Sequence, residues 1–143
     1  MANIVPFAFK GELASGTHNF ASGGNTFKIA LYTSNPYTTS STAFTATNEV
    51  SSSGGSNYPS GGKEWTSQTV TATTATTAID FADTTFASAT FTAAFAAIYN
   101  TSASNKLCVV LDFGGNKTAT NGTFTISYPD PSTPSNAIIS ITS

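Results

Sequence analysis

The stretch 91–113 constrains the fold more than any other part of the chain. It holds two apolar runs, 91–99 and 107–113, on either side of a short polar segment, 100–105. Two apolar runs of strand length around a short polar turn are typical of a β-hairpin. We therefore expect a central hairpin here, with the other segments arranged in layers around it.

Both faces of this hairpin are apolar. Regular alternation places five large residues on one face: Phe91, Phe95, Leu107, Leu111 and Phe113. It places four smaller ones on the other: Ala94, Ala96, Ile98 and Val110. A strand with two apolar faces is normally covered on both sides. We expect the first set to face the core. The second set needs a cover, either the second sheet of the same domain or a neighbouring chain.

The remaining strand signals predict an all-β protein. Alternating or short apolar patterns recur along the chain, at 26–33, 64–73, 78–82, 124–128 and 137–142. Asn121-Gly122 precedes one of them, and this dipeptide predicts a hairpin turn within 114–122. About eight strands in all fit a single-domain antiparallel β-sandwich with a jelly-roll-like arrangement.

The N-terminal residues 1–25 form a separate unit in this interpretation. Phe9 and Leu13 are four residues apart, as on one face of a helix, and Gly16 follows as a stop signal. We expect an N-terminal arm with a short helical or irregular segment, followed by the β-sandwich domain 26–143. Two roles fit the arm equally well: it reaches a neighbouring subunit, or it forms a lid over one end of the sandwich.

Charged residues are scarce, at 8%, against roughly 25% in a typical soluble domain. Ser and Thr supply roughly a third of the chain, and Thr favours the pleated surface of a strand.

The charges limit the classes of partner. The chain has five Lys, no Arg and a net charge of −2, and so lacks the basic patch of a nucleic-acid binder. The chain has no apolar run of membrane-spanning length, and its start lacks the pattern of a signal peptide. We expect neither nucleic-acid nor membrane partners. A surface with few charges favours a role inside an assembly.

No residue pattern predicts catalysis, a cofactor or a metal. The chain has one histidine, His18, and one cysteine, Cys108, which are too few for a zinc site. We expect His18 to serve polar packing or a turn, and Cys108 to be a small buried apolar residue. Asp80 and Asp83 fit a turn and a cap better than a calcium site or a carboxylate pair. The Gly-rich loop 51–62 lacks the Gly-Lys-Ser/Thr ending of a phosphate-binding loop.

Several sequence blocks, in an order and spacing that cover nearly the whole chain, resemble a family of small virion structural proteins of tailed bacteriophages. The blocks are FKGEL at 9–13, GTHNF at 16–20, FKIALYT at 27–33, TNEV at 47–50, YPSGG at 58–62, AIYN at 97–100, VLDFGG at 110–115 and NAII at 136–139. The resemblance implies a component of the phage particle, assembled in the host cytoplasm. It implies no catalytic residues.

From this resemblance we expect a capsid decoration, or cement, protein that bridges subunits of the major capsid protein and forms a homo-oligomer, a dimer or trimer. The residues expected at protein contacts are Phe9, Leu13, Tyr58 and Trp65. Two alternatives remain open. One is a neck, tail or fibre protein that binds other virion proteins. The other is a carbohydrate-binding module for host attachment, with Trp65 and Tyr58 as stacking platforms.

Overall fold

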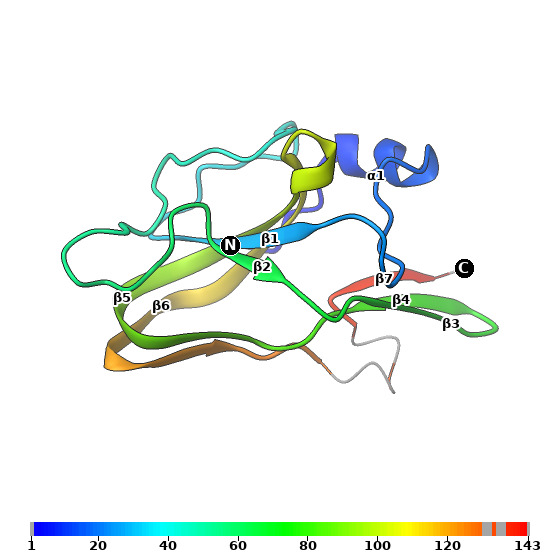
Figure 1. Cartoon of the computed structure of the whole chain (residues 1–143). Helices are drawn as coiled ribbons and strands as arrows, with labels where there is room; N and C mark the ends of the chain where they lie inside the picture. The colour runs from blue at the N-terminus through cyan, green and yellow to red at the C-terminus, as the bar shows by residue number, and fades with distance from the viewer. Residues whose placement is uncertain (1, 130–132, 134–136, 143) are drawn as a thin grey trace.

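The computed structural model describes residues 2–129, 133 and 137–142, which form two antiparallel sheets and one short helix (Figure 1). The first sheet has the order β2-β1-β5-β6, with β1 (Phe27–Tyr32), β2 (Lys63–Trp65), β5 (Thr84–Asn100) and β6 (Lys106–Ile126). The second has the order β3-β4-β7, with β3 (Thr69–Ala72), β4 (Thr76–Asp80) and β7 (Ile139–Thr142). The helix α1 spans Phe7–Ala14. The all-β sandwich is confirmed, with seven strands instead of eight, while the jelly-roll-like arrangement stays a prediction.

The central hairpin is confirmed. Strands β5 and β6 pair antiparallel and are joined by the 3₁₀ turn η1 (Thr101–Ala103), followed by Ser104 and Asn105 in the left-handed conformation. Asn100 begins this turn, because its side-chain oxygen accepts a hydrogen bond from the backbone N–H of Ser102. The polar segment between the two apolar runs therefore forms the expected connection.

The hairpin is longer than expected and bends back on itself. Its pairing continues to Thr84 and Ile126, with register shifts on both sides of Ala89. Ser88 and Asn121, near this point, have φ of 51° and 48°. Beyond the bend the ribbon returns along the other layer of the sandwich (Figure 1). Bulges with left-handed residues let a strand turn a corner and change layers.

The predicted hairpin turn at Asn121-Gly122 is therefore wrong. Gly122 pairs with Ala89 inside the ribbon, and the segment from 124 onward begins as part of β6. Asn121 does adopt the left-handed conformation that made the prediction plausible, but this conformation serves the corner of a long strand. Two predicted strands are thus one, whereas the predicted strand 64–73 forms two, β2 and β3.

The predicted division of the hairpin faces is wrong for Phe95, Ala96, Ile98 and Leu107, whereas Leu111 and Phe113 pack against the main core and Val110 lies on the opposite face, as predicted. A register shift between Ala93 and Phe95 puts the strand out of phase by one residue. As a result Phe91, Ala93 and Ala96 belong to the large core cluster between the layers. Phe95 instead packs with a second, smaller cluster on the opposite face of the sheet.

That opposite face is covered by neither the second sheet nor a neighbouring chain, so this expectation is corrected too. The cover is the loop between β1 and β2 together with the N-terminal segment. Phe44 of the loop stacks on Tyr99, with ring centroids 4.5 Å apart, and the hydroxyl oxygens of Tyr37 and Tyr32 are 2.7 Å apart. Ile4 packs against the same cluster. Loop segments without regular structure thus supply the third layer.

The N-terminal segment packs on the sandwich. Phe9, His18 and Phe20 are buried, and Phe20 stacks on Phe27 of β1 with ring centroids 4.3 Å apart. Helix α1 ends as expected, with Gly16 at φ 77° shortly after its last turn. Its described residues 2–25 cover the end of the core as the lid role expects, and a contact with a neighbouring subunit stays a prediction.

Candidate functional site

On one side of the sandwich, which we call the open side, the described residues add no further strand. No described strand pairs with the outer edge of β6 beyond Asp112 or with the outer edge of β7. Because β6 bends, both layers contribute to this side: its first arm (106–119) lies in one layer, and its second arm (123–126) lies in the other. Across the gap, the ring centroids of Phe113 and Phe124 are 6.3 Å apart. The open side therefore exposes the rim of the core between two unpaired strand edges.

Three adjoining hollows, of about 420, 320 and 570 Å³, follow this side. The first two share Phe113 and Ile126, and the last two share Ala137 and Ile138. We call these three adjoining hollows together the open-side cleft. Its apolar lining comes from both arms of β6, from β7 and from α1. The sequence did not reveal it, because alternation shows which residues are apolar but not which strand edge stays unpaired.

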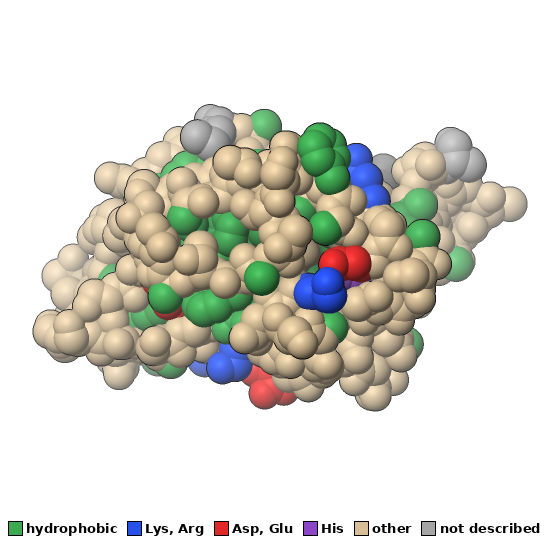
Figure 2. All heavy atoms as spheres, turned by 90° about the horizontal axis from the view of Figure 1, so that it is seen from above, with side chains coloured by type: hydrophobic (Ala, Val, Ile, Leu, Met, Phe, Trp, Pro, Cys, Tyr) green, Lys and Arg blue, Asp and Glu red, His purple; other side chains and the backbone are tan. Residues whose placement is uncertain are grey.

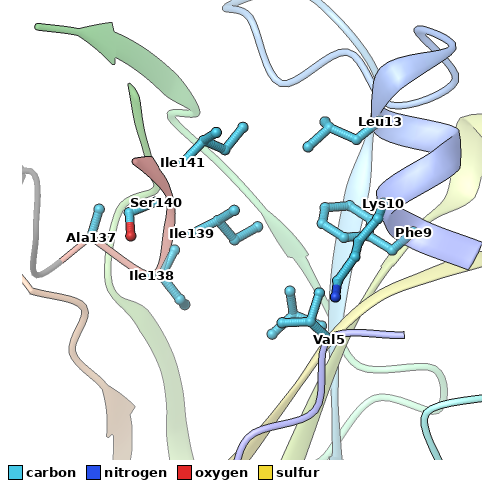
Figure 3. A pocket seen from close by; sticks show the side chains of 10 residues that line it. Val5, Phe9, Lys10, Leu13, Ala137, Ile138, Ile139, Ser140 and Ile141 are labelled. Carbon is cyan, nitrogen blue, oxygen red and sulfur yellow. The ribbon is translucent and has the colours of Figure 1, made fainter. Parts of the chain in front are cut away.

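The hollow at the α1 end has the largest volume of the three, about 570 Å³, and Figure 3 shows the side chains that line it. Phe9 and Leu13 project from α1 toward Ile139 and Ile141 of β7, and Val5 lies below them. Val5 and Ile141 are 42% and 50% exposed, so two large apolar side chains in the lining of this hollow are open to solvent. This end is an apolar surface open to solvent.

The four residues expected at contacts fall into two groups. Phe9 and Leu13 line the open-side cleft, although Phe9 itself is almost fully buried. Tyr58 and Trp65 do not line it, and both are buried. The Tyr58 hydroxyl accepts from the N–H of Leu31 and donates to Glu49. The Trp65 ring is covered by Phe81, with ring centroids 3.4 Å apart. Neither ring offers a free face to a sugar.

A buried polar cluster joins α1 to the central hairpin. His18 Nε2 lies 2.9 Å from Glu12 Oε2, and His18 Nδ1 lies 3.0 Å from the amide nitrogen of Asn100. An amide nitrogen only donates, so Nδ1 accepts and Nε2 carries the hydrogen that Glu12 receives. Lys106 also donates to Glu12. His18 thus serves polar packing, as expected from the sequence.

Glu12, His18 and Cys108 are arranged like the acid, base and nucleophile of a hydrolase triad. The Cys108 sulfur lies 3.7 Å from His18 Nδ1. A cysteine nucleophile must ionise and must be reached by its substrate. Cys108 is fully buried, lines none of the described hollows, and burial raises the pKa of its thiol. The arrangement therefore supports the fold. Sequence reasoning missed this cluster because its members lie as far apart as His18 and Cys108 in the chain.

The cluster predicts a pH dependence of stability. Partial burial raises the pKa of Glu12, but hydrogen bonds from Lys106 and His18 outweigh this effect, so the pKa is lowered from 4.5. A lowered pKa stabilises the fold above pH 4.5, and the stabilisation is lost as the pH falls from there through the pKa of Glu12 in the folded state.

The wild type should therefore have a larger free energy of unfolding than Glu12→Gln near neutral pH, and the difference should shrink on acidification. Urea unfolding between about pH 6 and about pH 3 measures it. A difference that stays constant across this range would contradict the prediction.

Within residues 2–129, 133 and 137–142, no group of three or more His, Cys, Asp or Glu is placed to hold a metal ion. No helix formed by those residues is long and apolar enough to cross a membrane. Asp83 caps the end of β6 by accepting from the N–H of Tyr128, in line with the cap expected from the sequence.

Comparisons with protein-family models, with curated proteins and with solved structures find no match to this chain.

Proposed function

We propose that this chain is a virion structural protein of a tailed bacteriophage that decorates the capsid, where it binds the major capsid protein from outside and bridges neighbouring subunits. The resemblance of its sequence blocks supports the phage assignment. The structural observation that carries a binding role is the open-side cleft, an apolar surface between unpaired strand edges.

The surface chemistry supports the same role. The face in Figure 2 consists mainly of uncharged polar side chains and backbone, with few charged groups and several apolar patches. Burying apolar surface against a partner contributes about 25 cal/mol per Å², and sparse charge lowers the desolvation cost of such contacts. A subunit that spans two capsid proteins in this way opposes their separation under internal DNA pressure.

A neck, tail or fibre protein would differ from a decoration protein in the number of copies per particle. The carbohydrate-binding alternative has no structural observation in its favour. Sugar binding was assigned to Trp65 and Tyr58, which are 1% and 2% exposed. A stacking platform needs an open ring face. We therefore retain decoration as the proposal and use copy number to test it against a place in the neck, tail or fibre.

Particles that lack this protein should regain heat resistance when the purified chain is added. We expect DNA release to shift upward by several degrees, with on the order of hundreds of copies bound per particle, as symmetric capsid sites require. Dye uptake during heating and quantitative gel analysis measure the two quantities. Bound protein at about three to twelve copies would place it in the neck or tail. Absence of binding, or binding without any thermal effect, would contradict cementing.

A further inference from the structure

We infer that the open-side cleft binds an extended segment of a partner polypeptide, which adds as a strand to the outer edge of β6 and inserts alternate apolar side chains between the two layers. This inference deepens the proposed function and rests on it for the identity of the partner, a capsid protein. The recognition chemistry itself is argued from the strand edge and the cleft.

The first argument is the unpaired backbone of the second arm of β6. The N–H of Tyr128 points inward and donates to Asp83. Because N–H groups alternate in direction along a strand, those of Thr125 and Ser127 point to the open side. Both residues are exposed, and no described strand pairs with them on this side. Such an edge supplies the main-chain hydrogen bonds by which an added strand is held.

The second argument is that the chain already places one extended segment on the outer edge of the first arm of β6, in the other layer of the open side. Ile4 and Val110 exchange two backbone hydrogen bonds of 2.9 Å each in an antiparallel bridge. The side chain of Asn3 then accepts from the N–H of Asp112 at 2.9 Å. The first arm of β6 therefore accepts a strand up to Asp112. Beyond this point, from Phe113 onward, no described strand occupies the edge.

The third argument is the shape and chemistry of the cleft. Half-buried Leu111, Phe113 and Ile138 line it and pack against the main core. The first two hollows adjoin the second arm of β6 and the third adjoins β7, so they offer successive places for the alternate side chains of an extended segment. Lys117 and Lys10 line its two opposite ends. A partner segment with apolar residues at alternate positions and an acidic residue near each end complements this surface.

The backbone test uses Thr125, whose side chain is exposed. Thr125→Pro removes the outward N–H, and a proline is tolerated on an edge strand. Thr125→Val keeps the N–H and is the matched control. Random peptides of about 12 residues, displayed on beads, should yield sequences with alternating apolar residues that bind the wild type and Thr125→Val equally. They should bind Thr125→Pro at least about tenfold more weakly.

A side-chain test covers the case that Thr125→Pro fails to fold. Phe113→Glu places a charge in the cleft and should also weaken binding at least about tenfold. Val70→Glu, in β3 and outside the cleft, replaces a residue that is 46% exposed and should leave binding unchanged. Selected peptides without alternation, failure to select any, or equal binding to all folded variants would overturn the inference.

Two further measurements separate this inference from the proposed function. If particles bind Phe113→Glu as well as wild type, the cleft inference is overturned while decoration stands. If peptides bind as described but particles do not bind the wild type, decoration fails and strand addition at the cleft stands. Sedimentation of the free protein tests a second copy as the occupant. A wild-type dimer that becomes a monomer in Phe113→Glu would assign the cleft to self-association and overturn the inference.

Discussion

Gly62→Ala is expected to lose roughly 3–5 kcal/mol of unfolding free energy, since it combines backbone strain with a steric clash. Gly62 has φ of 80°, and a Cβ at this position would lie 1.9 Å from the carbonyl oxygen of Ile29. Ile29 cannot move away, because it is paired with Lys63 on one side and Ile98 on the other. The clash falls on the centre of the four-stranded sheet.

Gly55→Ala is the matched control for this prediction. Gly55 has nearly the same φ, 77°, but a Cβ there meets no atom within 4 Å. Gly55→Ala should therefore lose only the unfolding free energy that backbone strain accounts for, about 1 kcal/mol. Urea unfolding of both variants gives the comparison. Equal losses would mean that the sheet yields at Ile29 and that the close approach of Gly62 is unimportant.

Trp65→Ala should lower the free energy of unfolding by about 3–5 kcal/mol, as large-to-small substitutions of buried aromatic residues do. Trp65 is 1% exposed, lies flat on Phe81, and meets Tyr128 edge-on with ring centroids 5.4 Å apart. It thus joins β2 to the opposite layer. Its removal leaves a cavity that rigid strands on both sides are unable to fill.

Phe7→Ala is the control for Trp65→Ala. Phe7 is 64% exposed, and exposed substitutions of this kind usually stay within about 0.5 kcal/mol of the wild type. Thermal and urea unfolding of the two variants test the contrast. A small effect at Trp65 would show that this ring is not a core residue, and would restore its candidacy as a contact or sugar-binding platform.

Local patterns predicted several elements correctly. The apolar runs around 100–105 predicted the hairpin of β5 and β6, and the alternation of 26–33 predicted β1. The spacing of Phe9 and Leu13 before Gly16 predicted α1. Each of these three elements is specified by residues close together in the sequence. The spacing of their apolar side chains and their backbone conformation are therefore set locally. The burial of Cys108 was predictable for the same reason, since it lies inside an apolar run.

Other features could not be read from such patterns. Asn121-Gly122 favours a left-handed backbone, which serves a hairpin turn and a strand corner equally well. The choice depends on whether β5 continues alongside, and it does as far as Thr84. The phase change after Ala93 has a similar origin, because a bulge depends on the partner strand. Once the phase was misjudged, the faces of Phe95, Ala96 and Ile98 were misjudged as well, whereas those of Leu111 and Phe113 were predicted correctly.

The candidate site was only partly predictable. Phe9 and Leu13 were named from their helical spacing, and both line the open-side cleft. Tyr58 and Trp65 were named as aromatic residues in or beside a loop. They lie in the core because Glu49 and Phe81, distant in the sequence, pair with them. The cleft itself lies where strand edges have no partner among the described residues, which depends on how the whole sheet forms.

The sequence by itself therefore determined the all-β class, the central hairpin and the scarcity of charge on the surface. These follow from composition and from the period of side chains along a strand. Only the tertiary structure decided where the long ribbon changes layers, which loops cover its second face, and which side of the sandwich stays open. These features depend on contacts between distant segments, such as the hydrogen bond that joins His18 to Asn100.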